Sequence, residues 1–163
     1  MSVEINGIAH IQFTITHPEV GLPFWESLCH FMGMKTLIRN EETVYCIGGR
    51  TGLLARAAPP EKRGQTFDQW TAGLHHFCIR ARSREDVDAI HEHARALVAN
   101  IVHPPEEGDR FAPGYYSVLF EDPDGIRIEI NHIPGIGNFG DEGRLGPDGK
   151  GPARRYGEEG LKD

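Results

Sequence analysis

Among the residues whose side chains can bind divalent metal ions, three stand at matching places in strand-like segments. They are His10 in "GIAHIQFTI", His76 in "GLHHFCIRA" and Glu129 in "IRIEINH". Two neutral imidazoles and one carboxylate form a facial ligand set that binds Fe(II) and similar ions and leaves positions open for substrate or dioxygen. Taken singly, each residue would be an ordinary exposed polar side chain. The prediction of a metal site therefore depends on whether the fold brings the three together.

The segment around His10 alternates between apolar and polar residues, as a strand with one buried face does. The apolar side chains at positions 9, 11, 13 and 15 share one face, which we expect to pack against a helix. His10 and Gln12 share the opposite face. A polar cavity would explain this second set better than an edge exposed to solvent.

The segment around His76 repeats the first, with a glycine at its start and His76 at the place of His10. The repeat predicts that His76 and Arg80 face the cavity and that the neighbouring His75 faces the helix. A histidine pair in one strand would thus contain one metal ligand and one packing residue.

The last strand-like run carries Glu129 and Arg127 on the face opposite to that of its isoleucines. Together with Gln12 and Arg80, Arg127 is predicted to bind an anionic or carbonyl group of a substrate. Each of the three strands thus offers one metal ligand on the side away from the helices.

Around these strands, the sequence predicts two modules of the same architecture. A helix is expected over Pro18 to Met32, ending near Gly33, and a second helix begins after a capping-box pattern at Ser83 and Asp86. Three strand-like runs follow each helix. The chain is therefore predicted to be an α+β protein with two βαβββ modules, at about 3–58 and 70–134.

The segments "GIAHIQF", "GLHHFCI" and "FEDPDGIRIEI" together resemble the vicinal oxygen chelate superfamily, which includes glyoxalase I, fosfomycin-resistance proteins and extradiol dioxygenases. The resemblance covers about 3–133. It implies that the paired modules form a curved mixed sheet around a metal cavity, often within a homodimer. It also implies that His10, His76 and Glu129 bind the metal and that a small molecule chelates it through neighbouring oxygens.

Departures from the family patterns limit what reaction the resemblance implies. Glyoxalase I has a fourth ligand, a glutamate that also acts as base, where this chain has Leu or Ala in "TGLLARAA". Extradiol dioxygenases have a catalytic tyrosine where this chain has Leu119, and Tyr115 is a candidate substitute. The set of three ligands favours a dioxygenase-like oxidoreductase with Fe(II), while Mn, Ni, Zn or Co remain alternatives. A glyoxalase-like lyase or isomerase and a non-catalytic drug- or metabolite-binding protein remain alternative functions.

Composition adds expectations about partners and location. The net charge of −7 argues against binding to nucleic acid or to an anionic membrane surface. The N-terminal residues have no signal-peptide pattern, and the three cysteines lack CxxC spacing, so we expect a cytoplasmic protein. One domain is expected at 1–134, and the Gly-rich segment 135–163 is expected to be a flexible tail.

Overall fold

The structure, a computed structural model, describes residues 7–134 of the chain, and the expected tail at 135–163 lies outside the described residues. The first half contains β1 (His10–Ile15), α1 (Pro18–Phe31), β2 (Lys35–Arg39), β3 (Thr43–Gly48) and β4 (Thr51–Ala57). A short 3-10 helix, η1 (Pro60–Lys62), lies between the halves. The second half contains β5 (Phe77–Arg80), α2 (Arg84–Ala96), β6 (Asn100–Glu107), β7 (Tyr116–Glu121) and β8 (Arg127–His132).

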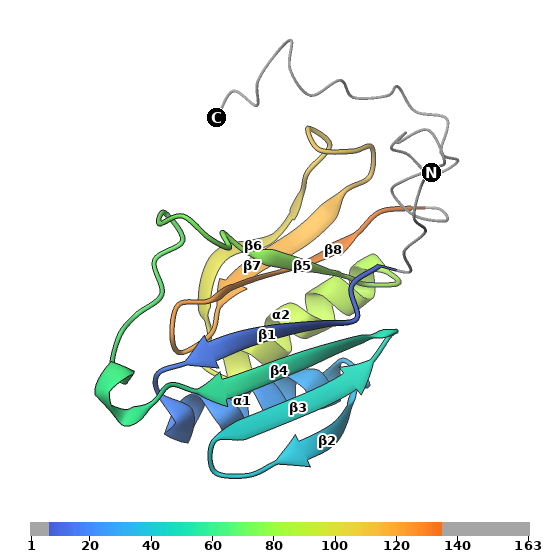
Figure 1. Ribbon diagram of the computed structural model, residues 1–163. Helices are drawn as coiled ribbons and strands as arrows, with labels where there is room; N and C mark the ends of the chain where they lie inside the picture. The colour runs from blue at the N-terminus through green and yellow to red at the C-terminus, as the bar shows by residue number, and fades with distance from the viewer. Residues whose placement is uncertain (1–6, 135–163) are drawn as a thin grey trace, which may run out of the picture.

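Each half folds as a βαβββ module with its own four-stranded mixed sheet (Figure 1). Sheet A has the strand order β1-β4-β3-β2, and sheet B has the order β5-β8-β7-β6. The first and last strands of each module pair in parallel, and the other pairs are antiparallel. The predicted α+β class and the two modules are confirmed. The sheets remain separate, so the described part of one chain does not close around a cavity.

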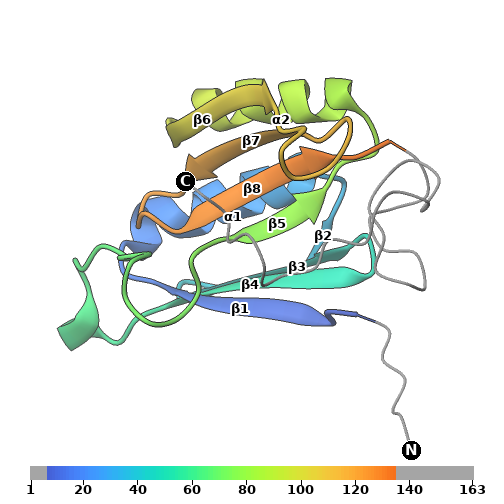
Figure 2. The same ribbon diagram turned by 90° about the horizontal axis from the view of Figure 1, so that it is seen from above.

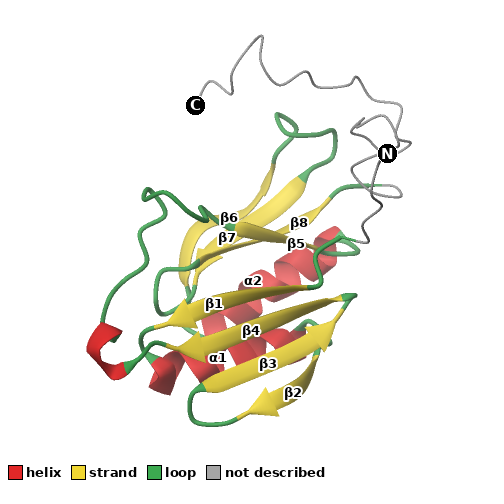
Figure 3. Ribbon diagram, in the orientation of Figure 1, coloured by secondary structure: helices red, strands yellow, loops and turns green. Residues whose placement is uncertain are grey.

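One helix covers one face of each sheet (Figure 3). α1 packs on all four strands of sheet A, α2 packs on β6, β7 and β8, and the two helices contact each other. The opposite faces carry no helix, as Figure 1 shows from the front. We call them the open faces, which are marked by His10 and Gln12 in sheet A and by Cys78 and Glu129 in sheet B.

The two helices follow from local sequence signals. α1 begins with a proline, whose missing N–H is not needed in a first turn, and ends before Gly33, which has a φ of +76°. α2 has a complete capping box, because the Ser83 Oγ accepts from the Asp86 amide and the Asp86 carboxylate accepts from the Ser83 amide, each at 3.1 Å. No helix among residues 7–134 is long and apolar enough to cross a membrane.

Aromatic side chains join the modules where the edge strands β1 and β5 come near each other (Figures 1 and 2). The ring of Phe13 in β1 lies 4.1 Å from that of Trp25 in α1, and each ring lies 6.1 Å from that of Phe77 in β5. All three residues are buried. The modules therefore share one core rather than folding as independent units.

Two buried carboxylates of the turn before β8 also hold the modules together. Asp122 accepts hydrogen bonds from the indole of Trp25 at 2.8 Å and from the amides of Asp124 and Ile126. Asp124, which is 2 % exposed, accepts from the amide and hydroxyl of Thr16 and pairs with His17 at the start of α1. We call Asp122 and Asp124 the carboxylate clamp. The clamp fixes the turn from which β8 delivers Glu129.

Candidate metal centre

The open face of sheet A carries His10 and Gln12, as alternation predicts. Both side chains are exposed, while Phe13 and Ile15 on the helix side of the same strand are buried. The register pairs His10 with Gly52 of β4. The predicted face of this strand is therefore confirmed.

His76 and Glu129 lie side by side at the open face of sheet B. The His76 Nε2 is 3.2 Å from the Glu129 Oε2, and their side chains are 37 % and 14 % exposed. The parallel pairing of β5 with β8 sets Cys78 beside Glu129, and His76 precedes β5 on the same side. The structure thus brings two of the three predicted ligands together, with Glu129 in β8 and His76 directly before β5.

Hydrogen bonds at Glu129 favour its anionic form. Burial alone raises the pKa of this carboxyl, but hydrogen bonds with His76, Tyr115 and Ser117 outweigh burial and lower its pKa. The Tyr115 hydroxyl donates to the Glu129 Oε1 at 2.6 Å. Burial, and then this hydrogen bond, raise the pKa of Tyr115, so the phenol keeps its proton at neutral pH. Tyr115 is thus suited to donate a proton or a hydrogen bond rather than to act as a base.

His10 lies on the other sheet and does not join this pair within one chain. Among residues 7–134, no group of three or more His, Cys, Asp or Glu side chains could hold a metal ion. The chain therefore presents its three predicted ligands as two parts, with His76 and Glu129 on sheet B and His10 on sheet A.

The predicted substrate-binding residues differ in how they are held. Gln12 and Arg80 are exposed on the open faces. Arg127 is engaged instead, because its Nε donates to the Glu121 Oε1 at 2.9 Å. Its Nη2 also donates to the Gln69 side-chain oxygen at 3.0 Å when the amide is oriented with that oxygen toward Arg127. Its contacts are those of a residue that holds the loop before β5, and a role in substrate binding stays a prediction.

His75 does not pack against the helix, so that prediction is wrong. β5 begins only at Phe77, and His75 belongs to the preceding loop, where strand alternation does not apply. Its exposed ring contacts His76, with 2.7 Å between the two Nδ1 atoms, and meets the ring of Trp70 edge-on at 5.6 Å. Desolvation, with the nearby charge of His76 and Arg127, lowers the pKa of His75.

Residues that sequence reasoning missed surround both parts of the site. Gln69 and Trp70 lie in the linker between modules, where no periodic pattern marks a strand or helix. The only available signal was a tryptophan in a polar segment, "TFDQWTAG". Near His10, the Tyr45 ring lies over Gly52, since a Cβ there would be 2.8 Å from the Tyr45 hydroxyl.

The open face of β4 carries no carboxylate. The register with β1 sets Gly52, Leu54 and Arg56 on the side of His10 and Gln12. A fourth acidic ligand, or a carboxylate base, is therefore not supplied by this strand. The structure agrees here with the sequence pattern "TGLLARAA".

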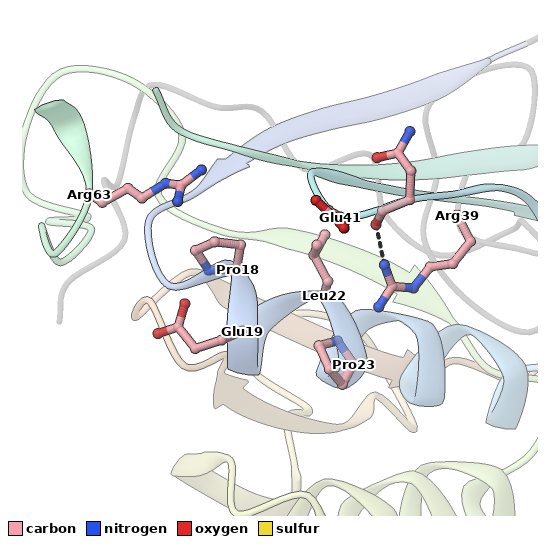
Figure 4. Close-up of a pocket in the computed structure, with 8 residues that line it drawn as sticks. Pro18, Glu19, Leu22, Pro23, Arg39, Glu41 and Arg63 are labelled. Atoms are coloured by element: carbon pink, nitrogen blue, oxygen red, sulfur yellow. Dashed lines mark hydrogen bonds between the residues drawn. The ribbon is translucent and has the colours of Figure 1, made fainter. Parts of the chain in front are cut away.

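Two surface hollows lie away from the His76–Glu129 pair. The first, of about 510 Å³, lies between the start of α1 and the β2–β3 turn, with Leu22, Arg39 and Arg63 on its wall (Figure 4). Both arginines are already engaged, with Glu26 and Glu42 respectively. The second, of about 480 Å³, lies beside the end of β1 and reaches the carboxylate clamp. Neither contains a predicted metal ligand.

Comparisons with known proteins give one matching family model and one curated relative of similar length. The model of the Glyoxalase/Bleomycin resistance protein/Dioxygenase superfamily matches residues 7–130. The Bacillus subtilis protein YqjT, which is uncharacterized, is 26 % identical over 125 residues, covering 74 % of this chain and 94 % of its own.

Solved structures share the fold. A candidate glyoxalase from Bacillus halodurans has a TM-score of 0.66 and 25 % identity, covering 78 % of this chain and 96 % of its own. A lactoylglutathione lyase from Agrobacterium tumefaciens has a TM-score of 0.56 and 21 % identity, covering 78 % and 94 % respectively. At that identity, the second likeness concerns the fold alone.

Proposed function

The chain belongs to the Glyoxalase/Bleomycin resistance protein/Dioxygenase superfamily, and from that premise we propose that it is a metal-dependent enzyme with dioxygenase-like chemistry on a small oxygen-chelating substrate. The observation that carries the proposal is the pairing of His76 with Glu129 at 3.2 Å, with the Tyr115 hydroxyl bound to the same carboxylate. An imidazole and an anionic carboxylate on an open face are suited to a divalent ion.

The predicted ligands have side chains of types that bind such an ion, but they lie on two separate sheets. Glu129 has a lowered pKa, so it is anionic without a metal, and His76 already contacts it. His10 is exposed on the other sheet. We propose that a second copy of the chain completes the site, with His10 of one protomer joining His76 and Glu129 of its partner.

The open faces support a homodimer as the functional unit. Apolar side chains are exposed on β2 and β3 of sheet A, with Ile38 at 46 % and Ile47 at 39 %. The register sets both on the side of His10, because Ile47 pairs with Gly52 and Ile38 pairs with Tyr45. Burial of these side chains against a second copy would favour association through the hydrophobic effect.

A divalent ion held by His10, His76 and Glu129 would polarise two neighbouring oxygens of a substrate and, as Fe(II), would supply electrons for dioxygen chemistry. The residues of the chain have separate tasks around it. Tyr115 holds a proton at its hydroxyl beside Glu129, and Gln12 and Arg80 offer hydrogen-bond donors to the rest of the substrate.

Dioxygenase-like chemistry is favoured over glyoxalase-like isomerisation by the residues of β4. Isomerisation moves a proton between neighbouring carbons and needs a base within hydrogen-bond reach. β4 offers Leu54 and Arg56 on its open face, and Tyr115 is protonated. Dioxygen chemistry needs open metal positions, which a set of three protein ligands leaves.

Oxygen uptake tests the proposal. Protein loaded with Fe(II) without air would be exposed to dioxygen and a panel of catechols, and the adduct of methylglyoxal with a thiol would be tested in parallel. We expect oxygen consumption with at least one catechol and none with the His76→Ala variant. Turnover of the adduct without oxygen uptake would favour the isomerase instead. If Fe(II), Mn(II), Ni(II) and Zn(II) neither bind nor shift the melting temperature, a metal-free binding protein is the better interpretation.

A further inference from the structure

The loop between η1 and β5 presents a tryptophan beside the candidate metal centre. Trp70 is 78 % exposed, whereas Trp25, the other tryptophan of the sequence, is 1 % exposed. A large apolar ring left in water marks a surface that gains free energy when another group covers it. The position of Trp70 relative to the metal ligands indicates what that group is.

A chain of contacts connects Trp70 to β8 through its indole nitrogen. With the Gln69 amide oriented so that its oxygen faces the two donors, this oxygen accepts from the Trp70 Nε1 at 2.8 Å and from the Arg127 Nη2 at 3.0 Å. Arg127 lies two positions before Glu129 in the same strand and is itself held by Glu121. The indole edge is therefore fixed relative to the strand that carries the metal-binding carboxylate.

A second chain of contacts connects the ring of Trp70 back to the same carboxylate. The Trp70 ring meets that of His75 at 5.6 Å and 74°, and the His75 ring meets that of His76 at 5.0 Å and 80°. His76 lies 3.2 Å from Glu129. The two series of contacts therefore connect Trp70 to Arg127 and to Glu129, both of which lie in β8.

The backbone below Trp70 is held as well. Its amide donates to the Asp68 Oδ1 at 2.9 Å, and the Thr71 hydroxyl donates to the Asp68 carbonyl at 2.8 Å. The Phe67 amide donates to the carbonyl of Asp124 at 2.8 Å, which ties the loop to the carboxylate clamp. An exposed ring on an anchored loop loses little conformational freedom when a ligand covers it.

We propose that Trp70, backed by His75, is a specificity residue that selects oxygen-chelating substrates carrying an aromatic ring. The inference rests on the proposed function, because the metal would bind the oxygens and Trp70 would contact the rest of the molecule. Trp70 makes a T-shaped contact with His75 and is still 78 % exposed, so most of the indole surface remains open to a ligand. Aromatic rings stack on or meet such a surface at 4.5–7 Å between centroids, as a general range. An aliphatic group of similar polarity gains less there.

A pair of probe acids separates ring recognition from chelation. Mandelate and lactate carry the same neighbouring hydroxyl and carboxylate oxygens. Mandelate has a phenyl group where lactate has a methyl group. With Mn(II)-loaded protein, we expect mandelate to bind more tightly and Trp70→Ala to weaken mandelate binding by about tenfold while leaving lactate binding unchanged. Trp70→Phe should retain most of the preference. Calorimetric titration measures all six binding constants, for the parent and the two variants with each acid.

Fluorescence gives a second readout that does not depend on turnover. Since Trp25 is buried, the red-shifted emission belongs to Trp70, and mandelate should quench it in the parent and not in Trp70→Phe. The matched control is Phe31→Ala, which removes a 46 % exposed ring that stacks on His93, away from the metal ligands. The Phe31→Ala variant should leave the binding constants of both acids and the quenching of fluorescence by mandelate unchanged.

The outcomes distinguish this inference from the proposed function. If neither acid binds to the metal-loaded parent, chelation at this site is contradicted, and the specificity role with it. If both acids bind to the parent, and Trp70→Ala weakens the binding of both equally or of neither, only the inference about Trp70 is overturned. Loss of the dimer in Trp70→Ala would overturn it too, because Trp70 would then be a subunit contact.

Discussion

Glu129 is the residue on which the contacts of the candidate metal centre converge. His76, Tyr115 and Ser117 each hydrogen-bond to its carboxylate, and together they lower its pKa despite burial. A carboxylate prepared in this way binds a cation without first losing a proton. The hydrogen-bonded neighbours therefore hold the Glu129 carboxylate in one orientation and also favour its anionic form.

Neighbouring histidines allow a matched test of which side chain binds metal. We expect His76→Ala to abolish Co(II) or Ni(II) binding, because it removes an imidazole 3.2 Å from Glu129. His75→Ala removes a ring of equal size one position away and should retain metal. Metal content after dialysis measures both. Equal metal loss in the two variants would show that His76 is not the specific ligand.

A substitution at Tyr115 separates a role in metal binding from a role in the reaction. Tyr115→Phe keeps the ring and removes the hydroxyl that donates to Glu129. We expect the metal to remain bound and the rate of oxygen consumption to fall about 10²–10⁴-fold, the usual contribution of a positioned proton donor. An unchanged rate in the metal-loaded variant would exclude a catalytic role for the phenol.

Alternation predicted the faces of His10 and Glu129 correctly, because both lie within strands where successive side chains change sides. The same rule failed at His75, which lies before the first residue of β5. Trp70 could not be predicted, because its position depends on Gln69, Arg127 and a loop that has no period. Residue roles in regular strands are thus more predictable than those in connections.

At the scale of elements, the turn before β8 does more than reverse the chain. The amide of Gly125 donates to the Asp122 carbonyl at 3.0 Å and closes a tight turn. The contacts of Asp122 with Trp25 and of Asp124 with Thr16 and His17 were not predictable. They join residues about a hundred positions apart, and periodicity carries no information on such pairs.

Removal of the Asp122 carboxylate should destabilise the fold strongly. Asp122→Ala leaves the buried Trp25 indole and the amides of Asp124 and Ile126 without their acceptor. We expect a loss of about 3 kcal/mol in the free energy of unfolding, measured with urea. Asp88→Ala removes an exposed acceptor of the Tyr116 hydroxyl and should cost less than about 1 kcal/mol. Equal losses in the free energy of unfolding would mean that the clamp stabilises the fold no more than an exposed hydrogen bond does.

The clamp should also make stability depend on pH. Burial raises the pKa of Asp122 to about 6, and the hydrogen bond with Asp124 raises the pKa of His17. For a group whose pKa is raised on folding, the stabilising contribution is present below its ordinary pKa and is lost as pH rises through the folded pKa. The melting temperature should therefore fall as pH rises from 3.8 through about 6, where Asp122 loses its proton, and fall further above 6.5, where His17 loses its proton.

Two variants isolate the part that His17 contributes. His17→Asn should flatten the profile above pH 6.5, because the charged partner of Asp124 is gone. Arg84→Gln breaks the exposed pair with Glu107 and should lower the melting temperature by the same amount just below and above pH 6.5, since a guanidinium stays charged across that range. A His17→Asn profile as steep as that of the parent would contradict the clamp as its source.

At the scale of the whole molecule, the fold was predictable and the assembly of the site was not. The internal repeat and the helix signals indicate two βαβββ modules, and each forms its own sheet. The repeat also suggests one cavity shared by three strands. The modules instead meet through their helices and the Phe13–Phe77 contact, and they leave His10 on a separate open face. Packing between modules depends on shape, which a linear pattern does not encode.

The most direct test of the central claim is to mix two inactive variants. His10→Ala and His76→Ala chains would be purified separately, refolded together and assayed for Ni(II) binding, with light scattering to follow a dimer of twice 18.2 kDa. A site completed by two protomers predicts that neither variant binds alone and that each mixed dimer regains one intact site. No recovery in a mixture that contains mixed dimers, or full metal binding by an isolated monomer of the parent, would contradict the account.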